Sequence, residues 1–388
     1  MADLTDQAFK RLNIRSGDKL ILCLDGGGIR GIMTLQLLKS LEQQAGIPCH
    51  QLFDMVSGTS TGGIIAGLIA LGKTAAEIEA LYLKLVDQVF EKRSWVADRF
   101  FNPPAYTKKK YREILKQEIG ATTTIEDVCR KTQTDLLITA KDVAEGEETF
   151  FSCFQDGDHF IGTYKDVLLR AVMEATMSAP TYFTPLERFV DGGVTTYNNP
   201  ALAAIMEAVQ YGPKGKYLAQ NLTVFSLGTG ARLQFVLSDN VVNPKGSDTI
   251  FWLKWIMSEA GDDASDMQNY LLRSGAFGRL DYRRFQISLD SLALSKLPNR
   301  PITGTDRMLS DISDEELANI ALDNVKYFSI MGTIGEAMVD FIKAKQNPPF
   351  GQDLVDDQRK EWLVSRTGDI ATIKKHMSDP VWLDKFET

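Results

Sequence analysis

A serine lies at the centre of the pentapeptide GTSTG, residues 58–62. This G-x-S-x-G pattern follows a short apolar segment (52–56) and precedes an apolar helix (64–71), which is the setting that a nucleophile elbow requires. Such a turn exposes the hydroxyl of Ser60, and the N-terminus of the helix stabilises developing negative charge. Small hydroxylated residues between a strand and a helix are also typical of plain turns and helix caps. The flanking elements favour the nucleophile.

Three consecutive glycines follow a buried strand in the segment DGGGIRG, residues 25–31. Glycines let the backbone approach a ligand closely and direct several amide groups into one concavity. The amides of Gly26, Gly27 and Gly28 therefore suit an oxyanion hole for an acyl-transfer intermediate. Arg30 belongs to the same loop, where its charge can bind an anionic head group or a phosphate.

A second interpretation of this loop remains open at this point. The glycine spacing in residues 26–31 also matches the G-x-G-x-x-G fingerprint of dinucleotide-binding proteins. That fingerprint expects an acidic residue about 20 positions later at the end of a strand. Asp54 is the candidate, although it lies inside a short apolar segment. A nucleotide- or dinucleotide-binding protein is thus the alternative to an enzyme of acyl transfer.

A serine nucleophile needs a base, and the chain has three histidines, His50, His159 and His376. None has a motif around it, so each is better explained as a surface or structural histidine. The best carboxylate is Asp191, which follows the apolar pair Phe189-Val190 and precedes two glycines. An aspartate with an ordinary pKa is a poor base, but burial beside the serine would raise its pKa. An ordinary Asp-Gly turn is the competing interpretation.

Apolar runs that end at glycines or polar turns alternate with segments of helical periodicity over the first 235 residues. This alternation favours an α/β fold with a mostly parallel central sheet flanked by helices. We predict strands at 19–24, 52–56, 136–140, 149–154, 189–191 and 222–227, and helices at 31–44, 64–71, 167–175 and 200–209.

The character of the chain changes beyond about residue 240, where amphipathic helices dominate. We predict helices at 250–257, 264–272, 311–327 and 334–345. The expected organisation is a polar N-terminal leader (1–16), a catalytic domain (17–235) and a mainly helical C-terminal region (236–388) that packs on the core.

Composition limits the classes of partner and compartment. The net charge of −8 argues against binding to a nucleic acid polymer, which relies on a basic face. Four cysteines without a C-x-x-C pair indicate neither a zinc site nor a redox motif, and they fit a reducing compartment. The first residues lack a secretory signal, and the longest apolar run (62–72) is too short to cross a bilayer. We therefore expect a cytoplasmic protein without a cofactor.

Three motifs occur in a fixed order: DGGGIRG (25–31), GTSTGG (58–63) and DGG (191–193). Together they resemble the patatin-like phospholipase family, over roughly residues 17–235. The resemblance implies a three-layer α/β hydrolase that cleaves acyl esters of glycerolipids at a membrane surface without a metal. Ser60 matches the family nucleophile and Asp191 its partner in a dyad that needs no histidine.

The resemblance also assigns roles around this dyad and suggests a form of regulation. The three glycines match the oxyanion loop, and Arg30 matches its basic residue. Apolar residues within 82–106 and the basic run 108–112 are candidates for contact with lipid, although a core helix followed by a solvated one explains them as well. Similar bacterial enzymes are anti-phage effectors switched on by cyclic dinucleotides. The C-terminal helices would then hold the sensor or a homo-oligomer interface; a lipase without such a switch is the alternative.

Overall fold

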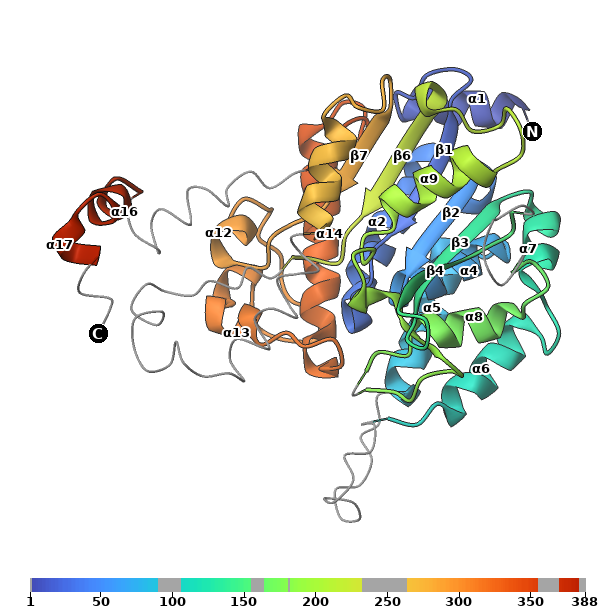
Figure 1. The fold of residues 1–388 in the computed structure, drawn as a ribbon, viewed down its shortest axis with the longest axis horizontal. Helices are drawn as coiled ribbons and strands as arrows, with labels where there is room; N and C mark the ends of the chain where they lie inside the picture. Colours follow the sequence, from blue (N-terminus) through green and yellow to red (C-terminus); the bar gives the residue numbers. More distant parts are fainter. Residues whose placement is uncertain are drawn as a thin grey trace, which may run out of the picture.

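A seven-stranded mixed sheet with helices on both faces forms the centre of the protein in a computed structural model (Figure 1). The structure describes residues 2–89, 106–154, 164–180, 182–231, 264–354 and 370–383. The strands are β1 (Lys19–Leu24), β2 (Met55–Thr59), β3 (Asp135–Asp142), β4 (Glu147–Ser152), β5 (Phe189–Asp191), β6 (Leu222–Leu227) and β7 (Asp281–Phe285).

The strand order is β4-β3-β2-β1-β6-β7, with β5 paired to β3. The neighbours from β3 through β2, β1 and β6 to β7 run parallel, whereas β4 and β5 run antiparallel to β3. This mostly parallel sheet confirms the predicted fold class.

The central strands are buried on both faces, as their apolar and small residues predict. Alternate side chains of β1 enter two separate apolar clusters, Leu20, Leu22 and Leu24 in one and Ile21 and Cys23 in the other. The larger cluster lies under α2 (Gly31–Ala45), α4 (Thr61–Ala70), α5 (Ala75–Val89), α8 (Leu169–Thr176) and α14 (Phe328–Lys345). The smaller one lies under α9 (Ala201–Tyr211), which crosses the opposite face of the sheet in Figure 1.

The remaining helices complete the two outer layers and the chain ends. They are α1 (Ala2–Arg11), α3 (Cys49–Leu52), α6 (Lys109–Ile119), α7 (Ile125–Thr132), α12 (Ser291–Leu294), α13 (Asp314–Ala318), α16 (Ile370–Met377) and α17 (Pro380–Leu383). Within the described ranges, none of the helices has the length and apolar character that a bilayer crossing requires.

Strand β3 explains how two distant segments meet. On one edge it pairs with β4 along residues 137–142. On the other edge it pairs first with β2, up to Thr59 opposite Thr139, and then with β5, where Asp191 is opposite Ala140. Strand β5 therefore continues the line of β2, and Asp191 lies next to the point where β2 ends.

Residues after 235 take part in the same core. Strand β7 extends the sheet beside β6, and α14 packs along α2. The two helices approach closely because Gly335 faces the backbone of Met33; a Cβ atom there would lie 2.8 Å from the Met33 carbonyl oxygen. The sequence DYRRF of β7 has too few apolar residues to have been predicted as a core strand.

Some predicted boundaries were wrong. Strand β2 begins at Met55 rather than 52, because the chain after Pro48 first forms the short helix α3. The predicted helix 311–327 is broken into α13 and single turns of 3-10 helix at 309–311 and 325–327. Long-range contacts override its helical periodicity, as the Leu322 carbonyl accepts a hydrogen bond from the Ile29 amide. The predicted helix 334–345 lies within α14, and 250–257 falls outside the described residues.

Candidate active site

Ser60 occupies a sharp turn between β2 and α4, with φ 52° and ψ −123°. A positive φ is rare for a residue other than glycine, and it is typical of strained positions at functional sites. The turn is possible because the residues two positions before and two positions after Ser60 are glycines. A Cβ atom on Gly58 would lie 2.2 Å from the Gly62 carbonyl oxygen, and one on Gly62 would lie 2.2 Å from that of Leu24. The geometry is that of a nucleophile elbow.

The hydroxyl of Ser60 donates a hydrogen bond of 2.6 Å to Oδ2 of Asp191. The other carboxylate oxygen, Oδ1, accepts from the amide of Gly193 at 2.7 Å, which fixes the orientation of the carboxylate. The backbone amide of Ser60 donates to Oγ1 of Thr176 at 2.8 Å and thereby ties the elbow to the end of α8. The structure thus brings together the serine and the aspartate that the sequence separates by 131 positions.

Asp191 is almost completely buried, with 4% of its surface exposed. Burial raises the pKa of its carboxyl from 3.8 to about 6, against the opposing effect of the hydrogen bonds from Ser60 and Gly193. The raised pKa makes the carboxylate a better proton acceptor than an exposed aspartate. A direct contact between a nucleophile and its base needs no intervening histidine.

The glycine loop after β1 lies beside this pair. The amide of Gly26 donates to the Asn198 carbonyl at 3.2 Å, so it already has an acceptor. No acceptor is found for the amides of Gly27 and Gly28 within the part of the chain that the structure describes. Thr61 begins α4, where a backbone amide has no acceptor inside the helix. The amides that remain for an oxyanion are therefore those of Gly27, Gly28 and Thr61.

Arg30 has a different setting from the one we predicted. Its Nη1 donates to the Gly230 carbonyl at 2.9 Å and its Nε donates to the Gly27 carbonyl at 3.3 Å. These bonds attach the glycine loop to the segment after β6. The binding of an anionic head group by Arg30 stays a prediction.

A mainly apolar cavity of about 70 Å³ opens onto the dyad. Ser60 and Asp191 are both among the residues that line it. The walls come from α4, α5, the segment after α8 and the C-terminal region, and they include Ile64, Tyr82, Leu85, Val86, Met177, Phe183, Leu322 and Asp323.

The other candidate residues lie elsewhere. His50 is on α3, before the start of β2, whereas Ser60 follows the end of that strand. His159 and the side chain of His376 lie outside the described residues. Asp54 precedes β2 as well, and its carboxylate binds the Lys19 amine at 2.8 Å. Asp54 thus lies at the start of the parallel strands, whereas the glycine loop lies at their carboxyl ends. Asp54 is therefore not placed to act as the acidic residue of a dinucleotide fingerprint.

The predicted lipid-contacting segment is only partly visible. Residues 90–105 lie outside the described residues. In the basic run, Lys108 is buried and lies 3.3 Å from Glu174, and Arg112 lies 2.6 Å from the same carboxylate. The expectation that the whole run meets lipid phosphates is therefore wrong for Lys108, because its charge is neutralised inside the protein.

Three contributors to the site were given no individual role by the sequence analysis. Tyr82 and Leu322 line the cavity, and Thr176 binds the Ser60 amide. Tyr82 lies in a helix whose periodicity indicates only burial, and Leu322 follows the catalytic motifs by more than a hundred residues. No local signal marks either residue.

Comparisons with known proteins agree with this geometry. Residues 22–205 match the family model described as "Patatin-like phospholipase". This part of the chain is therefore similar to the patatin-like phospholipase family. The family match contains the glycine loop, Ser60 and Asp191, and it confirms the resemblance drawn from the three motifs.

Two kinds of relative stand out among the curated proteins. The 85/88 kDa calcium-independent phospholipase A2 of Mus musculus is 32% identical over 81% of this chain and 39% of its own length. A cGAMP-activated phospholipase of Escherichia coli is 32% identical over 48% of this chain and 55% of its own length. A cGAMP-activated phospholipase of Vibrio cholerae is 27% identical over 83% of this chain and 94% of its own length. The chain thus spans 39% and 55% of the first two relatives and nearly all of the third.

Proposed function

We propose that this protein is a serine acyl-ester hydrolase of the phospholipase A type. The observation that supports it is the 2.6 Å hydrogen bond from Ser60 to the buried carboxylate of Asp191 in the lining of an apolar cavity. The apolar walls of this cavity suit the start of an acyl chain, whose ester carbonyl would then lie beside the dyad.

The mechanism follows from the positions of these groups. Asp191 accepts the hydroxyl proton as Oγ of Ser60 attacks the ester carbonyl carbon. The negative charge that develops on the carbonyl oxygen is stabilised by the amides of Gly27, Gly28 and Thr61. The C–O bond of the ester then breaks, the lysolipid alcohol leaves with the proton from Asp191, and an acyl-enzyme remains. Water then attacks the carbonyl carbon of the acyl-enzyme while Asp191 accepts its proton. The bond between that carbon and Oγ of Ser60 breaks, Oγ takes the proton back from Asp191, and the fatty acid leaves.

A cyclic dinucleotide activator belongs to the same proposal. It is supported by the two bacterial relatives named cGAMP-activated phospholipase, of which the Vibrio protein aligns over 94% of its length. We propose that cGAMP or a related cyclic dinucleotide raises the rate of ester hydrolysis.

The test is the release of free fatty acid from vesicles of mixed glycerophospholipids. Wild type and Ser60→Ala are compared, each with and without cGAMP and other cyclic dinucleotides, and with a calcium chelator. Release that needs Ser60 and persists in the chelator supports the hydrolase, and release that also needs one nucleotide supports the activator. Equal release by both proteins, or none under any condition, contradicts the proposal.

A further inference from the structure

We propose that Tyr82 is a positioning residue of this active site, and that its hydroxyl holds the oxyanion loop against the N-terminus of the nucleophile helix. The proposal rests on the proposed function, because it assigns a role in the stabilisation of the oxyanion. It adds a residue that none of the three motifs contains.

One hydroxyl group bridges the two halves of the oxyanion site. The hydroxyl of Tyr82, on α5, donates a hydrogen bond to the Gly28 carbonyl oxygen and accepts one of 2.9 Å from Oγ1 of Thr61. Gly28 belongs to the glycine loop, and Thr61 directly follows the nucleophile. The space for this bridge exists because residue 31 is glycine, where a Cβ atom would lie 2.9 Å from the Tyr82 oxygen.

The same contact fixes one peptide plane from both sides. The peptide between Gly28 and Ile29 is held through its carbonyl by Tyr82 and through its amide by the Leu322 carbonyl, at 2.8 Å. Gly28 has a φ of 55°, and its own amide lies on the other side of that φ bond. Anchoring the following peptide therefore restricts the direction in which the Gly28 amide points. An oxyanion donor that is oriented before the reaction needs no reorganisation during it.

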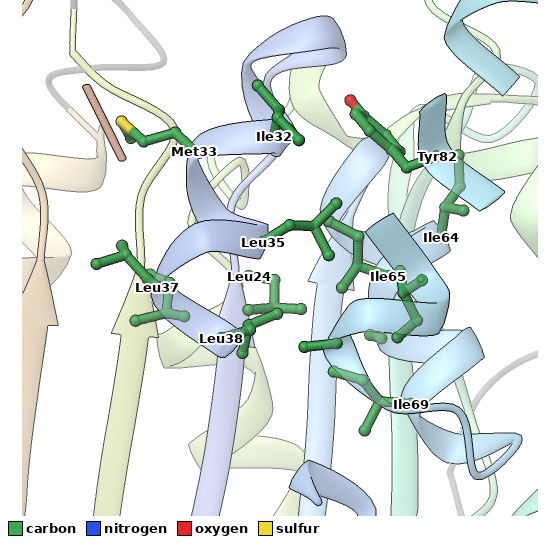
Figure 2. Close-up of a cluster of buried hydrophobic side chains, with 14 of the residues drawn as sticks. Leu24, Ile32, Met33, Leu35, Leu37, Leu38, Ile64, Ile65, Ile69 and Tyr82 are labelled. Atoms are coloured by element: carbon green, nitrogen blue, oxygen red, sulfur yellow. The ribbon is translucent and has the colours of Figure 1, made fainter. Parts of the chain in front are cut away.

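The ring of Tyr82 is itself well fixed. Only 5% of its surface is exposed, and its ring stacks on Phe328 with centroids 6.2 Å apart and an interplanar angle of 27°. Figure 2 shows the ring at one end of the apolar layer between α2 and α4, with the hydroxyl pointing toward the first turn of α2, where Ile32 lies. Burial raises the pKa of the Tyr82 hydroxyl. The group therefore stays protonated and acts as a hydrogen-bond donor, not as an acid or base.

The test measures kcat and KM for a soluble short-chain p-nitrophenyl ester with wild type, Tyr82→Phe, Thr61→Val and the double variant. The matched control is Tyr217→Phe, which removes a buried hydroxyl bonded to Asp54 and Asp135 at the opposite edge of the sheet. A displacement of a catalytic group by about 1 Å lowers the rate on the order of 100-fold. We expect Tyr82→Phe to lower kcat by roughly 10-fold to 100-fold with KM changed less than about twofold.

The remaining variants separate positioning from general destabilisation. Because Thr61 acts through the same hydroxyl, the double variant is expected to be no slower than Tyr82→Phe. The control Tyr217→Phe is expected to have a lower melting temperature and an unchanged kcat. Equal kcat in Tyr82→Phe and Tyr217→Phe overturns the inference. If Tyr82→Phe does not fold, Thr61→Val decides: a kcat equal to wild type overturns it. A wild-type activity that survives Ser60→Ala contradicts the proposed function instead.

Discussion

Lowering the pH should switch off the proposed hydrolase well above the pH at which ordinary aspartates protonate. The dyad works only while Asp191 is ionised, because the carboxylate must accept the Ser60 proton. Burial raises the pKa of Asp191 to about 6. At pH 5, about one carboxylate in ten is ionised, so kcat/KM should be about tenfold below its plateau near pH 8. An aspartate with the ordinary pKa of 3.8 would keep about nine-tenths of its activity at pH 5.

The assay is kcat/KM for a soluble acyl ester between pH 4.5 and 8.5, after subtraction of the rate of Ser60→Ala at each pH. A soluble substrate avoids the changes of charge that pH causes on a lipid surface. Circular dichroism at each pH shows whether the protein is still folded. Activity that stays constant down to pH 5 in folded protein would refute the assignment of Asp191 as a buried general base.

Three further predictions concern stability and the elbow. Asp191→Asn should lose about 10²-fold or more in kcat. The variant should nevertheless unfold at a higher urea concentration at pH 8, because it has no buried charge. The pKa of Asp191 is about 6 in the folded state against 3.8 ordinarily, and this difference corresponds to a gain of at most about 3 kcal/mol in the free energy of unfolding. This gain should disappear below pH 3.8, where the carboxyl is neutral in both states, and urea titrations at the two pH values measure it. Asp25→Ala leaves the guanidinium of Arg284 buried without its carboxylate, so it should lower the free energy of unfolding by about 3–5 kcal/mol. Replacing both partners, by Asp25→Leu with Arg284→Met, should recover part of that loss in the same urea titration. Gly62→Ala should abolish activity and lower the melting temperature, because its Cβ would lie 2.2 Å from the Leu24 carbonyl oxygen; unchanged melting would contradict the elbow geometry.

The parts of the fold that could be predicted are those in which local chemistry and tertiary structure agree. Strands β1 and β6 were found at 19–24 and 222–227, because five consecutive buried positions in β1 and six in β6 leave mainly apolar runs in the sequence. The elbow at Ser60 was found because a tight turn between a strand and a helix requires small residues at fixed positions. Such signals depend on neighbours within a few residues.

The position of Asp191 beside Ser60 depends on the register of β3, which no local pattern contains. Strand β5 has only three residues and is followed at once by a single turn of 3-10 helix at Gly192–Val194. Only the pairing of Asp191 with Ala140, one residue beyond Thr139, places its carboxylate at the end of β2. The order of the three motifs predicted the contact between Ser60 and Asp191 through family resemblance. The spacing of the residues alone did not predict it.

The active site extends beyond the segment that matches the family. The buried pair of Asp25 and Arg284 joins the start of the glycine loop to β7, and the carbonyls of Gly230 and Leu322 accept hydrogen bonds from Arg30 and from the Ile29 amide. All three attachments come from residues after 205, where the family match ends. The Ser60–Asp191 contact, by comparison, is set by strands inside the match. A movement of the C-terminal region would therefore act on the oxyanion loop while the register that holds the dyad together stayed intact.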